Sequence, residues 1–408
     1  MRTTLQSGSV FLLLFCNAGS FGKVITVGTA AELHEALAVP ARSLTIHLQP
    51  GVYDLTPAAM VDSSCGNCED ASISVSCTVG LRISGGFVHL RGPEDRSAIL
   101  RTHAGYGLFI EHCDSAIVEY LTITGGERDT SGPATDAAIV VKNSTALLRH
   151  NRIIGNIGDP AVVSAVVVGI MGICGRENSR TIITGNEIIG NSWDGIALYR
   201  GAEAEITGNL VDGVDKARGT DIGGGRGVGI GVTWNARATI RGNLVRRYWK
   251  GIGIFVDAHG VVENNIVEDI ITWGISLWDA GKGAPVGFIR RNIVYRTGAC
   301  GVSITRSAEG VRPGEFVDNI VVETGQNPKY DAPDYYCYQC ALALHAIPAF
   351  FVIDRNVFFG NRRATRDLPD RDVDRETFLR AVKPLCHGLT EHPVLQGSYF
   401  VRDFCSGQ

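Results

Sequence analysis

The sequence predicts an all-β solenoid, a fold in which short strands stack coil upon coil. The first observation is a repeated unit: an apolar strand, an Asn, then another apolar strand with Ile, Val or Phe two residues after the Asn. The second is that these segments are rich in β-branched residues and lack helical periodicity. The third is 50 glycines without a collagen-like period, which favours frequent tight turns. The repeated residues are Asn151, Asn186, Asn209, Asn243, Asn265, Asn292, Asn319 and Asn356.

The spacing of these asparagines sets the size of one coil. Asn186 and Asn209 are 23 residues apart, and Asn243 and Asn265 are 22 apart, so longer intervals indicate loops inserted into a fixed coil. A single coil would expose an apolar face, and stacking its neighbours creates the core. Each Asn is expected at a tight bend, because its short side chain tolerates left-handed backbone and can hydrogen-bond the equivalent Asn one coil away.

The two ends of the chain lack the repeat that characterises its centre. Residues 1–22 resemble an export signal, with Arg2 followed by an apolar run over 10–15 that is too short to span a bilayer. Residues 23–60 are expected to form a cap and first coil, with a helix over 29–38 and a strand and Pro-Gly turn over 44–55. The solenoid then occupies 61–360. A C-terminal capping tail over 361–408 contains a helix at 373–382.

The net charge and the cysteine content indicate which partners and which cellular compartment to expect. The net charge of −4 gives no sign of a nucleic-acid partner, and no membrane insertion is expected. Ten cysteines remain after the signal segment. We expect disulfides in a secreted protein, extracellular or periplasmic, because the Cys65/Cys68 and Cys337/Cys340 pairs lack histidines at zinc-finger spacing. Spacing leaves the connectivity open, although a Cys386/Cys405 bond would pin the tail. A monomer is expected.

These features resemble the right-handed parallel β-helix of the pectate lyase and polygalacturonase superfamily. The resemblance covers roughly residues 45 to 360 and includes the helix and the Pro-Gly turn at the start. It implies a right-handed parallel β-helix that acts on carbohydrate. It is specific for the fold and much less specific for the reaction.

Five Gly-led strands can be compared residue by residue. Alternation along each strand places Ile196/Leu198 and their equivalents inward, and Ala197/Tyr199 and their equivalents outward. The outward face therefore combines a column of tiny residues with a column of larger ones, which predicts a shallow floor beside a row of rings. Such rings suit stacking against sugars. The alternative is that loops cover them as a secondary core. The strands are "DGIALYR" (194–200), "GVGIGVTWN" (227–235), "KGIGIFVD" (250–257), "WGISLWD" (273–279) and "CGVSITR" (300–306).

Polar residues gather at both ends of these strands. In polygalacturonases, the strand resembling 194–200 bears catalytic carboxylates at its entry, and Asp194 matches that place. Lys250 stands where a second Asp would be expected, which argues against simple hydrolysis. The proposed catalytic residues are Asp194, Arg200, Lys250, Asp257 and Asp279. The proposed substrate contacts are Trp193, Tyr199, Arg226, Trp234, Asn235, Phe255, His259, Trp273 and Trp278.

The favoured function is β-elimination or C5-epimerisation of a uronic-acid polysaccharide, in which a basic residue removes the proton beside a carboxylate that other cations neutralise. One alternative is a glycoside hydrolase that pairs Asp194 with Asp257 or Asp279. Another is a non-catalytic carbohydrate-binding or cell-surface solenoid. The sequence assigns no cofactor. Calcium at Asp194, Asp221, Asp257 and Asp279 is a minority alternative, which needs adjacent coils to bring these carboxylates together.

Overall fold

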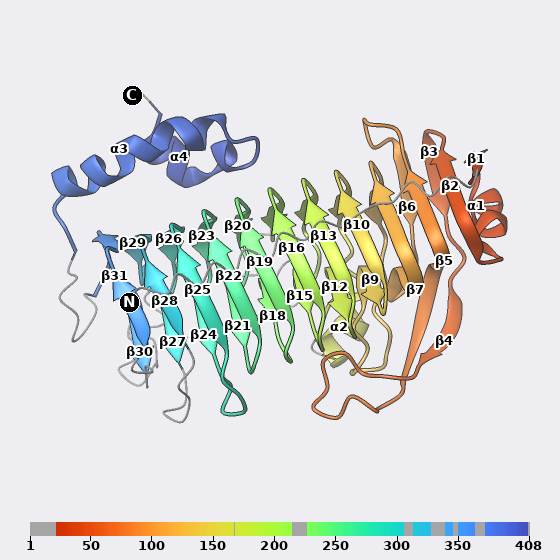
Figure 1. Cartoon of the computed structure of the whole chain (residues 1–408), viewed down its shortest axis with the longest axis horizontal. Helices are drawn as coiled ribbons and strands as arrows, with labels where there is room; N and C mark the ends of the chain where they lie inside the picture. Colours follow the sequence, from red (N-terminus) through yellow and green to blue (C-terminus); the bar gives the residue numbers. More distant parts are fainter. Residues whose placement is uncertain are drawn as a thin grey trace, which may run out of the picture.

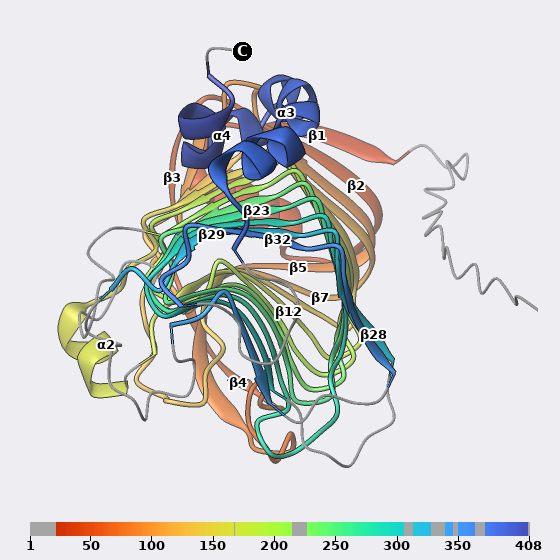
Figure 2. The same cartoon turned by 90° about the vertical axis from the view of Figure 1, so that its left-hand side faces the viewer.

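A computed structural model describes residues 22–166, 168–213, 227–305, 313–327, 339–345, 350–363 and 372–406. The chain winds as a solenoid whose coils repeat three strands, and Figures 1 and 2 show them from the side and along the axis. Each strand pairs in parallel with its equivalents in the coils before and after it, as the sequence predicts. The described residues contain one antiparallel pairing, between β4 (Ala58–Asp62) and β5 (Val75–Arg91).

The strands form three walls, which we name A, B and C in the order in which a coil passes through them. The long strands β5 and β7 (Tyr106–Glu119) bend from wall A into wall B. Wall A contains β9 (Ala137–Lys142), β12 (Met171–Arg176), β15 (Ile196–Leu198), β18 (Val228–Val232), β21 (Lys250–Phe255), β24 (Trp273–Trp278), β27 (Cys300–Thr305) and β30 (Leu342–His345).

Walls B and C complete each coil. Wall B contains β1 (Lys23–Val27), β2 (Ala41–Leu48), β10 (Thr145–Arg149), β13 (Arg180–Thr184), β16 (Glu203–Thr207), β19 (Arg237–Arg241), β22 (His259–Glu263), β25 (Val286–Arg290), β28 (Gly314–Val317) and β31 (Phe351–Asp354). Wall C contains β3 (Gly51–Asp54), β6 (Ala98–Arg101), β8 (Thr122–Thr124), β11 (Arg152–Ile154), β14 (Glu187–Ile189), β17 (Leu210–Asp212), β20 (Leu244–Arg246), β23 (Ile266–Ile270), β26 (Ile293–Thr297), β29 (Ile320–Thr324) and β32 (Val357–Phe359).

The core fills the space that the three walls enclose. The residues assigned inward by alternation on wall A, from Ile196 and Leu198 to Val302 and Ile304, are all fully buried in one cluster. Apolar side chains from every coil contribute to this cluster, so each coil depends on its neighbours for a dry interior. The inward and outward assignment of the Gly-led strands is therefore confirmed.

The repeated asparagines form a continuous ladder between walls B and C. From Asn186 onward, each side-chain oxygen accepts hydrogen bonds from the backbone N–H and the side-chain amide of the equivalent Asn in the preceding coil; both distances are 2.9 Å between Asn209 and Asn243. The ladder runs from Asn151 to Asn356. The expectation that the Asn itself adopts left-handed backbone is wrong. The residue before it does so, as at Gly208 (φ 61°) and Arg291 (φ 52°).

The predicted N-terminal helix is present as α1 (Ala30–Leu37). Thr29 and Glu32 form a capping box that satisfies its first N–H groups. Leu33 is fully buried in the core beside the first coil. The predicted strand and Pro-Gly turn correspond to β2, the turn at Pro50 and Gly51, and β3. The expected export signal lies, apart from Gly22, outside the described residues.

The C-terminal segment packs along the side of the solenoid. The predicted helix over 373–382 continues to Glu391 as α3 (Arg375–Glu391), followed by η3 (Leu395–Gly397) and α4 (Tyr399–Phe404). Their apolar side chains, Phe378 and Phe400 among them, cover the outer face of β20, β23, β26 and β29. The expected Cys386–Cys405 disulfide joins α3 to the residue after α4. In the described part of the chain, no helix is long and apolar enough to cross a membrane.

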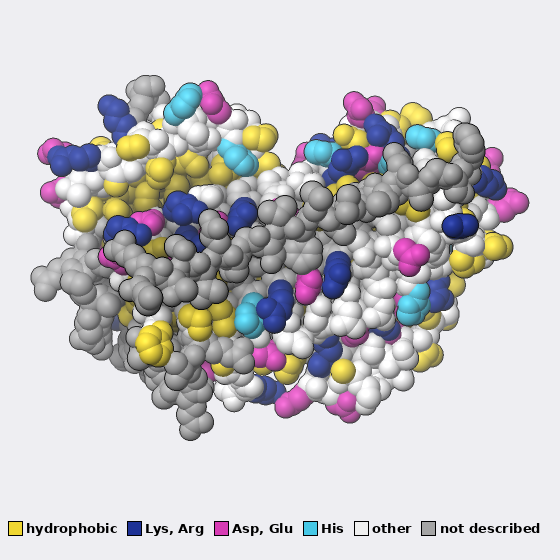
Figure 3. Space-filling view, viewed as in Figure 1, with side chains coloured by type: hydrophobic (Ala, Val, Ile, Leu, Met, Phe, Trp, Pro, Cys, Tyr) yellow, Lys and Arg dark blue, Asp and Glu magenta, His cyan; other side chains and the backbone are white. Residues whose placement is uncertain are grey.

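The outer face of wall B has the composition of an ordinary solvated strand surface. In Figure 3 it carries Lys or Arg interspersed with Asp or Glu. Arg241 and Arg290 from neighbouring coils both pair with Glu263, at 3.1 and 3.2 Å. The two arginine side chains are partly exposed, whereas the Glu263 side chain that they share is buried. Wall A differs from this pattern, and its outer face carries the candidate site.

Candidate functional site on wall A

The outward residues of wall A lie in register across five coils. Ala197 is opposite Gly231, then Gly253, Ser276 and Ser303, which confirms the predicted column of small residues. A pocket of about 460 Å³ opens on this face. Six of the predicted site residues line it: Trp193, Asp194, Tyr199, Lys250, Phe255 and Trp278. The remaining lining residues are Asn67, Gly227, Val228, Gly231, Thr233, Trp249, Val256 and Ala280.

Asp194 lies at the entry to β15 and is 6% exposed. Its Oδ1 accepts a hydrogen bond of 2.6 Å from the backbone N–H of Val228 in the next coil. Gly227 allows this close approach, because a Cβ there would lie 2.0 Å from the same oxygen. Burial raises the pKa of Asp194 to about 7, although the hydrogen bond from Val228 and the nearby charge of Lys250 oppose the increase. Such a carboxyl can gain or lose a proton near neutral pH.

Lys250 begins β21, and its ammonium lies among three aromatic rings. The Nζ atom is 4.6 Å from the ring centroid of Trp273, 5.3 Å from that of Phe255 and 5.4 Å from that of Trp278. Register explains this arrangement, since Lys250 is paired with Trp273 and Phe255 with Trp278. These rings stabilise a cation through their negative faces, and the charge of Lys250 is thereby fixed beside the pocket.

The predicted row of rings is only partly open. Trp278 is 38% exposed, whereas Tyr199 and Trp273 are 5% and 8% exposed. The ring of Phe255 folds back over Gly253, where a Cβ would lie 2.0 Å from its Cζ. The expectation of an exposed row is therefore correct for Trp278 and wrong for Tyr199, and the proposed substrate contact Trp273 is also buried. A glycine in the floor has no side chain, and a neighbouring aromatic ring packs into the space above it.

Tyr199 lies at the exit of β15, on the side of the pocket nearer the N-terminus. Burial and the neighbouring Asp194 raise the pKa of Tyr199 well above its usual value, so the phenol keeps its proton. Its hydroxyl donates to the Sδ atom of Met171 at 3.9 Å. Tyr199 belongs to an apolar cluster on the outer face of the N-terminal half of wall A, and Trp193 packs against the same cluster. Tyr199 is therefore a buried, protonated phenol that lines the same pocket as Asp194.

Three proposed catalytic residues lie at strand exits and are absent from the pocket lining. Arg200 donates from Nε to the carbonyl of Cys65 and from Nη2 to that of Glu69, both at 3.3 Å. Asp257 accepts a hydrogen bond of 2.6 Å from the backbone N–H of Asn235, and Asp279 accepts one of 2.9 Å from Gly281. These contacts hold loops and turns together.

Several proposed substrate contacts are likewise separated from the pocket. His259 begins β22 and belongs to wall B, opposite Arg237 and Val286. Asn235 is exposed at the turn between walls A and B. Trp234 donates from its indole N–H to Asn67, at 3.1 Å, and Arg200 lies over its ring at 5.1 Å. Arg226, together with Asp221 and Arg306, lies outside the described residues.

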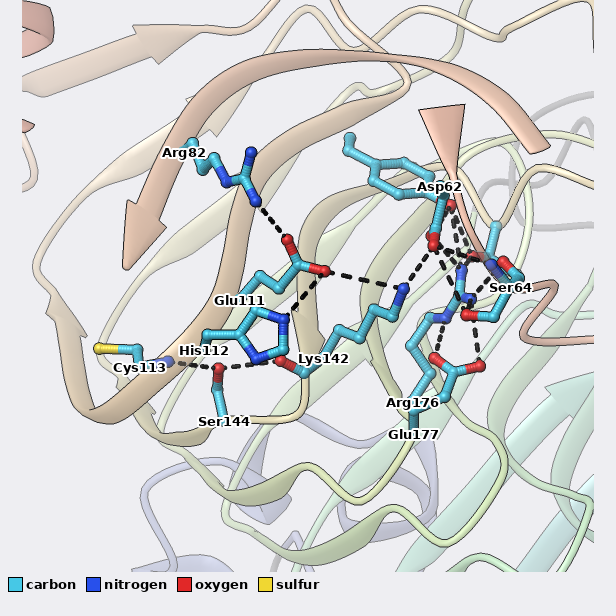
Figure 4. A network of polar contacts seen from close by, with 12 residues as sticks. Asp62, Ser64, Arg82, Glu111, His112, Cys113, Lys142, Ser144, Arg176 and Glu177 are labelled. Atoms are coloured by element: carbon cyan, nitrogen blue, oxygen red, sulfur yellow. Dashed lines mark hydrogen bonds and ion pairs between the residues drawn. The ribbon is translucent and has the colours of Figure 1, made fainter. Parts of the chain in front are cut away.

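Two features of this face were missed by sequence reasoning. One is Asn67, which reaches the pocket from the segment between β4 and β5. The other is a buried polar network in which Asp62 meets Lys142 and Arg176 (Figure 4). Lys142 and Arg176 are both at the ends of wall A strands, in the same outward column. Extending the alternation argument backward from β15 would have found them.

The described residues contain two disulfides and no group suited to a metal. Cys65–Cys68 closes a short loop after β4, and Cys386–Cys405 closes the C-terminal segment. Cys77, Cys113 and Cys174 are buried free thiols, and burial raises the pKa of each. Across the described ranges, no three His, Cys, Asp or Glu side chains gather as metal ligands.

A known family model covers most of the solenoid. The model described as "Right handed beta helix region" matches residues 58–222 and 171–330, which together span two thirds of the chain. The chain belongs to the right-handed β-helix family. No curated protein sequence matches it.

Solved structures share the fold at low similarity. An exopolygalacturonase from Thermotoga maritima has a TM-score of 0.48 and 12% identity, over 82% of this chain and 83% of that one. An alginate lyase from Paenibacillus sp. str. FPU-7 has a TM-score of 0.38 and 15% identity, over 72% and 94%. The periplasmic alginate epimerase AlgG has a TM-score of 0.42 and 10% identity, over 83% and 86%. At this similarity they assign no reaction to this chain.

Proposed function

We propose that this chain is a secreted enzyme that removes a proton beside the carboxylate of a uronic-acid polysaccharide, with β-elimination or C5-epimerisation as the result. One observation carries the proposal: a cation, Lys250, and a buried carboxyl with a pKa of about 7, Asp194, line the same pocket. Two disulfides support export to an oxidising compartment.

The reaction needs three tasks, and the pocket residues can divide them. Lys250 pairs with the sugar carboxylate, which stabilises the negative charge that develops there when the C5 proton leaves. Asp194, in its ionised form, accepts that proton. Tyr199 is a protonated donor beside Asp194, and Trp278 offers an exposed ring for a sugar face.

The two outcomes diverge once the C5 proton has left. In elimination, the electron pair from the C5–H bond forms a C4–C5 double bond, the C4–O bond breaks, and the departing oxygen takes a proton from Tyr199. In epimerisation, the C4–O bond stays intact and C5 receives a proton from Tyr199 on its opposite face. Both begin with the same acid–base step.

Hydrolysis is less well supported by the arrangement. It uses two carboxyl groups flanking one glycosidic bond. Among the described residues that line the pocket, Asp194 is the one carboxylate, whereas Asp257 and Asp279 accept hydrogen bonds from turns. A carbohydrate-binding solenoid without activity would need only Trp278 and its neighbouring rings.

The decisive experiment is incubation of the full chain with a panel of polyuronates. Ultraviolet absorbance detects the unsaturated product of elimination, and proton NMR detects inverted C5 centres. We expect one of these signals, and its loss by a factor on the order of 10²–10⁴ in Asp194→Asn and Lys250→Met. Lys383→Met, an exposed position on α3, is the matched control and should retain activity.

Other outcomes would replace the proposal. New reducing ends without unsaturation would identify a hydrolase. Binding without turnover of any polymer would identify a carbohydrate-binding module. Full activity in both Asp194→Asn and Lys250→Met would show that the reaction occurs elsewhere on the molecule.

A further inference from the structure

The segment from the last residue of β4 to the first residue of β5, residues 62–75, reaches the pocket from a distant coil. It leaves wall A near the N-terminal end of the solenoid and passes over the outer face of the following coils (Figure 1). Asn67 at its tip lines the pocket together with Asp194 and Tyr199, more than 120 positions later in the chain. We name residues 62–75 the end loop.

The base of the end loop is anchored by buried charge. Asp62 is 3% exposed and meets the ammonium of Lys142 and, at 3.0 Å, the guanidinium of Arg176 (Figure 4). Arg176 also donates to the backbone oxygen of Ser64 at 2.7 Å. Lys142 and Arg176 come from successive coils, so the end loop is attached to the body of the solenoid rather than merely lying on it.

The tip of the end loop is held by three side chains at strand exits. Arg200 donates to two of its carbonyl oxygens. Trp234 donates to the side-chain oxygen of Asn67. Lys282 pairs with Glu69 at 2.7 Å. The Cys65–Cys68 disulfide closes the backbone between these contacts. The position of the tip is therefore fixed by several independent contacts.

The floor beneath this segment is closed to a polymer. On the N-terminal side of the pocket, the outward floor residues are Phe109, Val140, Cys174 and Ala197, at most 1% exposed. They pack in one apolar cluster with Cys77 and Val79, which come after the end loop in the chain. Floor residues beyond the pocket are equally buried, since Ser276 and Ser303 are each 1% exposed. The neighbouring column separates the two sides: Lys142 and Arg176 are 4% and 0% exposed, whereas Trp278 is 38% exposed. A sugar chain lying along wall A is thus blocked at Asn67.

We propose that the end loop makes this a pocket for chain ends, so that the enzyme acts on the terminal units of its polymer rather than at internal positions. The inference rests on the proposed function, because it specifies how the same pocket receives its substrate. Asn67, Trp193 and Tyr199 form the closed side, and the polymer extends from Lys250 toward Trp278 and beyond. The molar concentration of chain ends, and not the total mass of polysaccharide, then sets the concentration of substrate that the enzyme can use.

The test compares two fractions of one polyuronate at the same mass concentration, one with chains about ten times shorter than the other. At concentrations below saturation, we expect the shorter fraction to react about tenfold faster, because rate depends on the concentration of productive ends. Either signal, unsaturation or C5 inversion, can be used. Equal initial rates for the two fractions would overturn the proposal while leaving the proposed reaction intact.

A paired variant tests the role of the end loop itself. Cys65→Ser/Cys68→Ser combined with Arg200→Met and Lys282→Met removes the disulfide and two of the three side chains that hold the tip. Cys386→Ser/Cys405→Ser removes a disulfide remote from the pocket. We expect the combined variant to lose much of the tenfold rate ratio between short and long chains, and the second variant to retain it. An unchanged ratio in both would overturn the assignment to the end loop. If the wild-type protein acts on no polyuronate, the proposed function itself fails.

Discussion

The two halves of wall A have the same backbone and opposite surfaces. In the N-terminal half, the outward column holds Glu111, Lys142 and Arg176, and the end loop and its flanking strand cover it. In the C-terminal half, the same column holds Tyr199, Thr233, Phe255 and Trp278, and a pocket opens beside it. The coils share one backbone geometry. They differ in their outward residues and in whether the end loop covers them.

Two buried aspartates show what this difference does to chemistry. Burial by itself would raise the pKa of Asp62, but Arg176 and Lys142 outweigh it and hold that pKa below its usual value. Among the described residues no guanidinium pairs with Asp194, and burial raises its pKa to about 7. A buried carboxylate stays ionised where cations surround it and becomes a proton carrier where they do not. The covered half is therefore structural, and the open half is suited to acid–base work.

The largest expected effect is on the covered half. Arg176→Met removes a fully buried cation and leaves the carboxylates of Asp62 and Glu177 without a main partner. We expect the free energy of unfolding to fall by about 3–5 kcal/mol. Denaturant unfolding measures this loss. Arg82→Met removes a partner of Glu111 that is 56% exposed, and should cost less than about 1 kcal/mol. Equal losses of stability in the two variants would show that burial does not determine how much each ion pair contributes.

The next effect concerns the pH dependence of stability in the open half. The folded protein holds the proton of Asp194 up to a pKa of about 7, whereas the unfolded chain releases it near the ordinary value of 3.8. The unfolded state therefore binds fewer protons between these pH values, and stability contributed by the protonated group is lost as pH rises to about 7. Asp194→Asn removes this dependence.

Unfolding measured at pH 4.5 and pH 8 isolates the contribution of this group. The stability of Asp194→Asn relative to the wild type should increase between the two values by about 3 kcal/mol, since other titrating groups cancel in the difference. Asp62→Asn serves as the contrasting case. The pKa of Asp62 lies below its usual value of 3.8, so its contribution is already present at pH 4.5, and the stability of Asp62→Asn relative to the wild type should change little between the two values. The same trend in both variants would contradict the comparison.

The smallest expected effect is on binding to the open half. Trp278→Ala should weaken polymer binding by about 1–3 kcal/mol, because a flat ring face would no longer stack on sugar. Titration of tryptophan fluorescence or calorimetry measures it. Tyr120→Ala is the control, since that ring stacks on His150 at the opposite end of wall B, away from the pocket. Unchanged affinity in Trp278→Ala would make that ring a structural one.

The repeat itself could be predicted because its signals are local and recur. Each Asn comes after a strand, and the same hydrogen bonds join it to the next coil wherever it occurs. Alternation along "DGIALYR" and its relatives assigned the inward residues without any tertiary information. The exception is the left-handed residue, which precedes the Asn. Both positions belong to one tight turn, and the Asn side chain is occupied by its ladder bonds.

The sequence predicted where the candidate site lies, but it did not predict all the residues that line it. Asp194 and Lys250 were found because they flank the Gly-led strands, and the pocket lining contains both. Asn67 could not be found, since it lies more than 120 positions away and no repeat marks it. Arg200 and Asp257 resemble active-site residues in the sequence, whereas their hydrogen bonds to Cys65 and Asn235 are visible only after the chain has folded.

The amino-acid order by itself determined the coil: its period, its dry interior, its asparagine ladder and the face on which small and aromatic residues gather. These properties depend on contacts between equivalent positions, and the residues that make those contacts recur in every repeat. Only the tertiary structure decided which part of that face is open and which charges are paired, because those features depend on a single segment, residues 62–75, crossing from one coil to others that share no pattern with it.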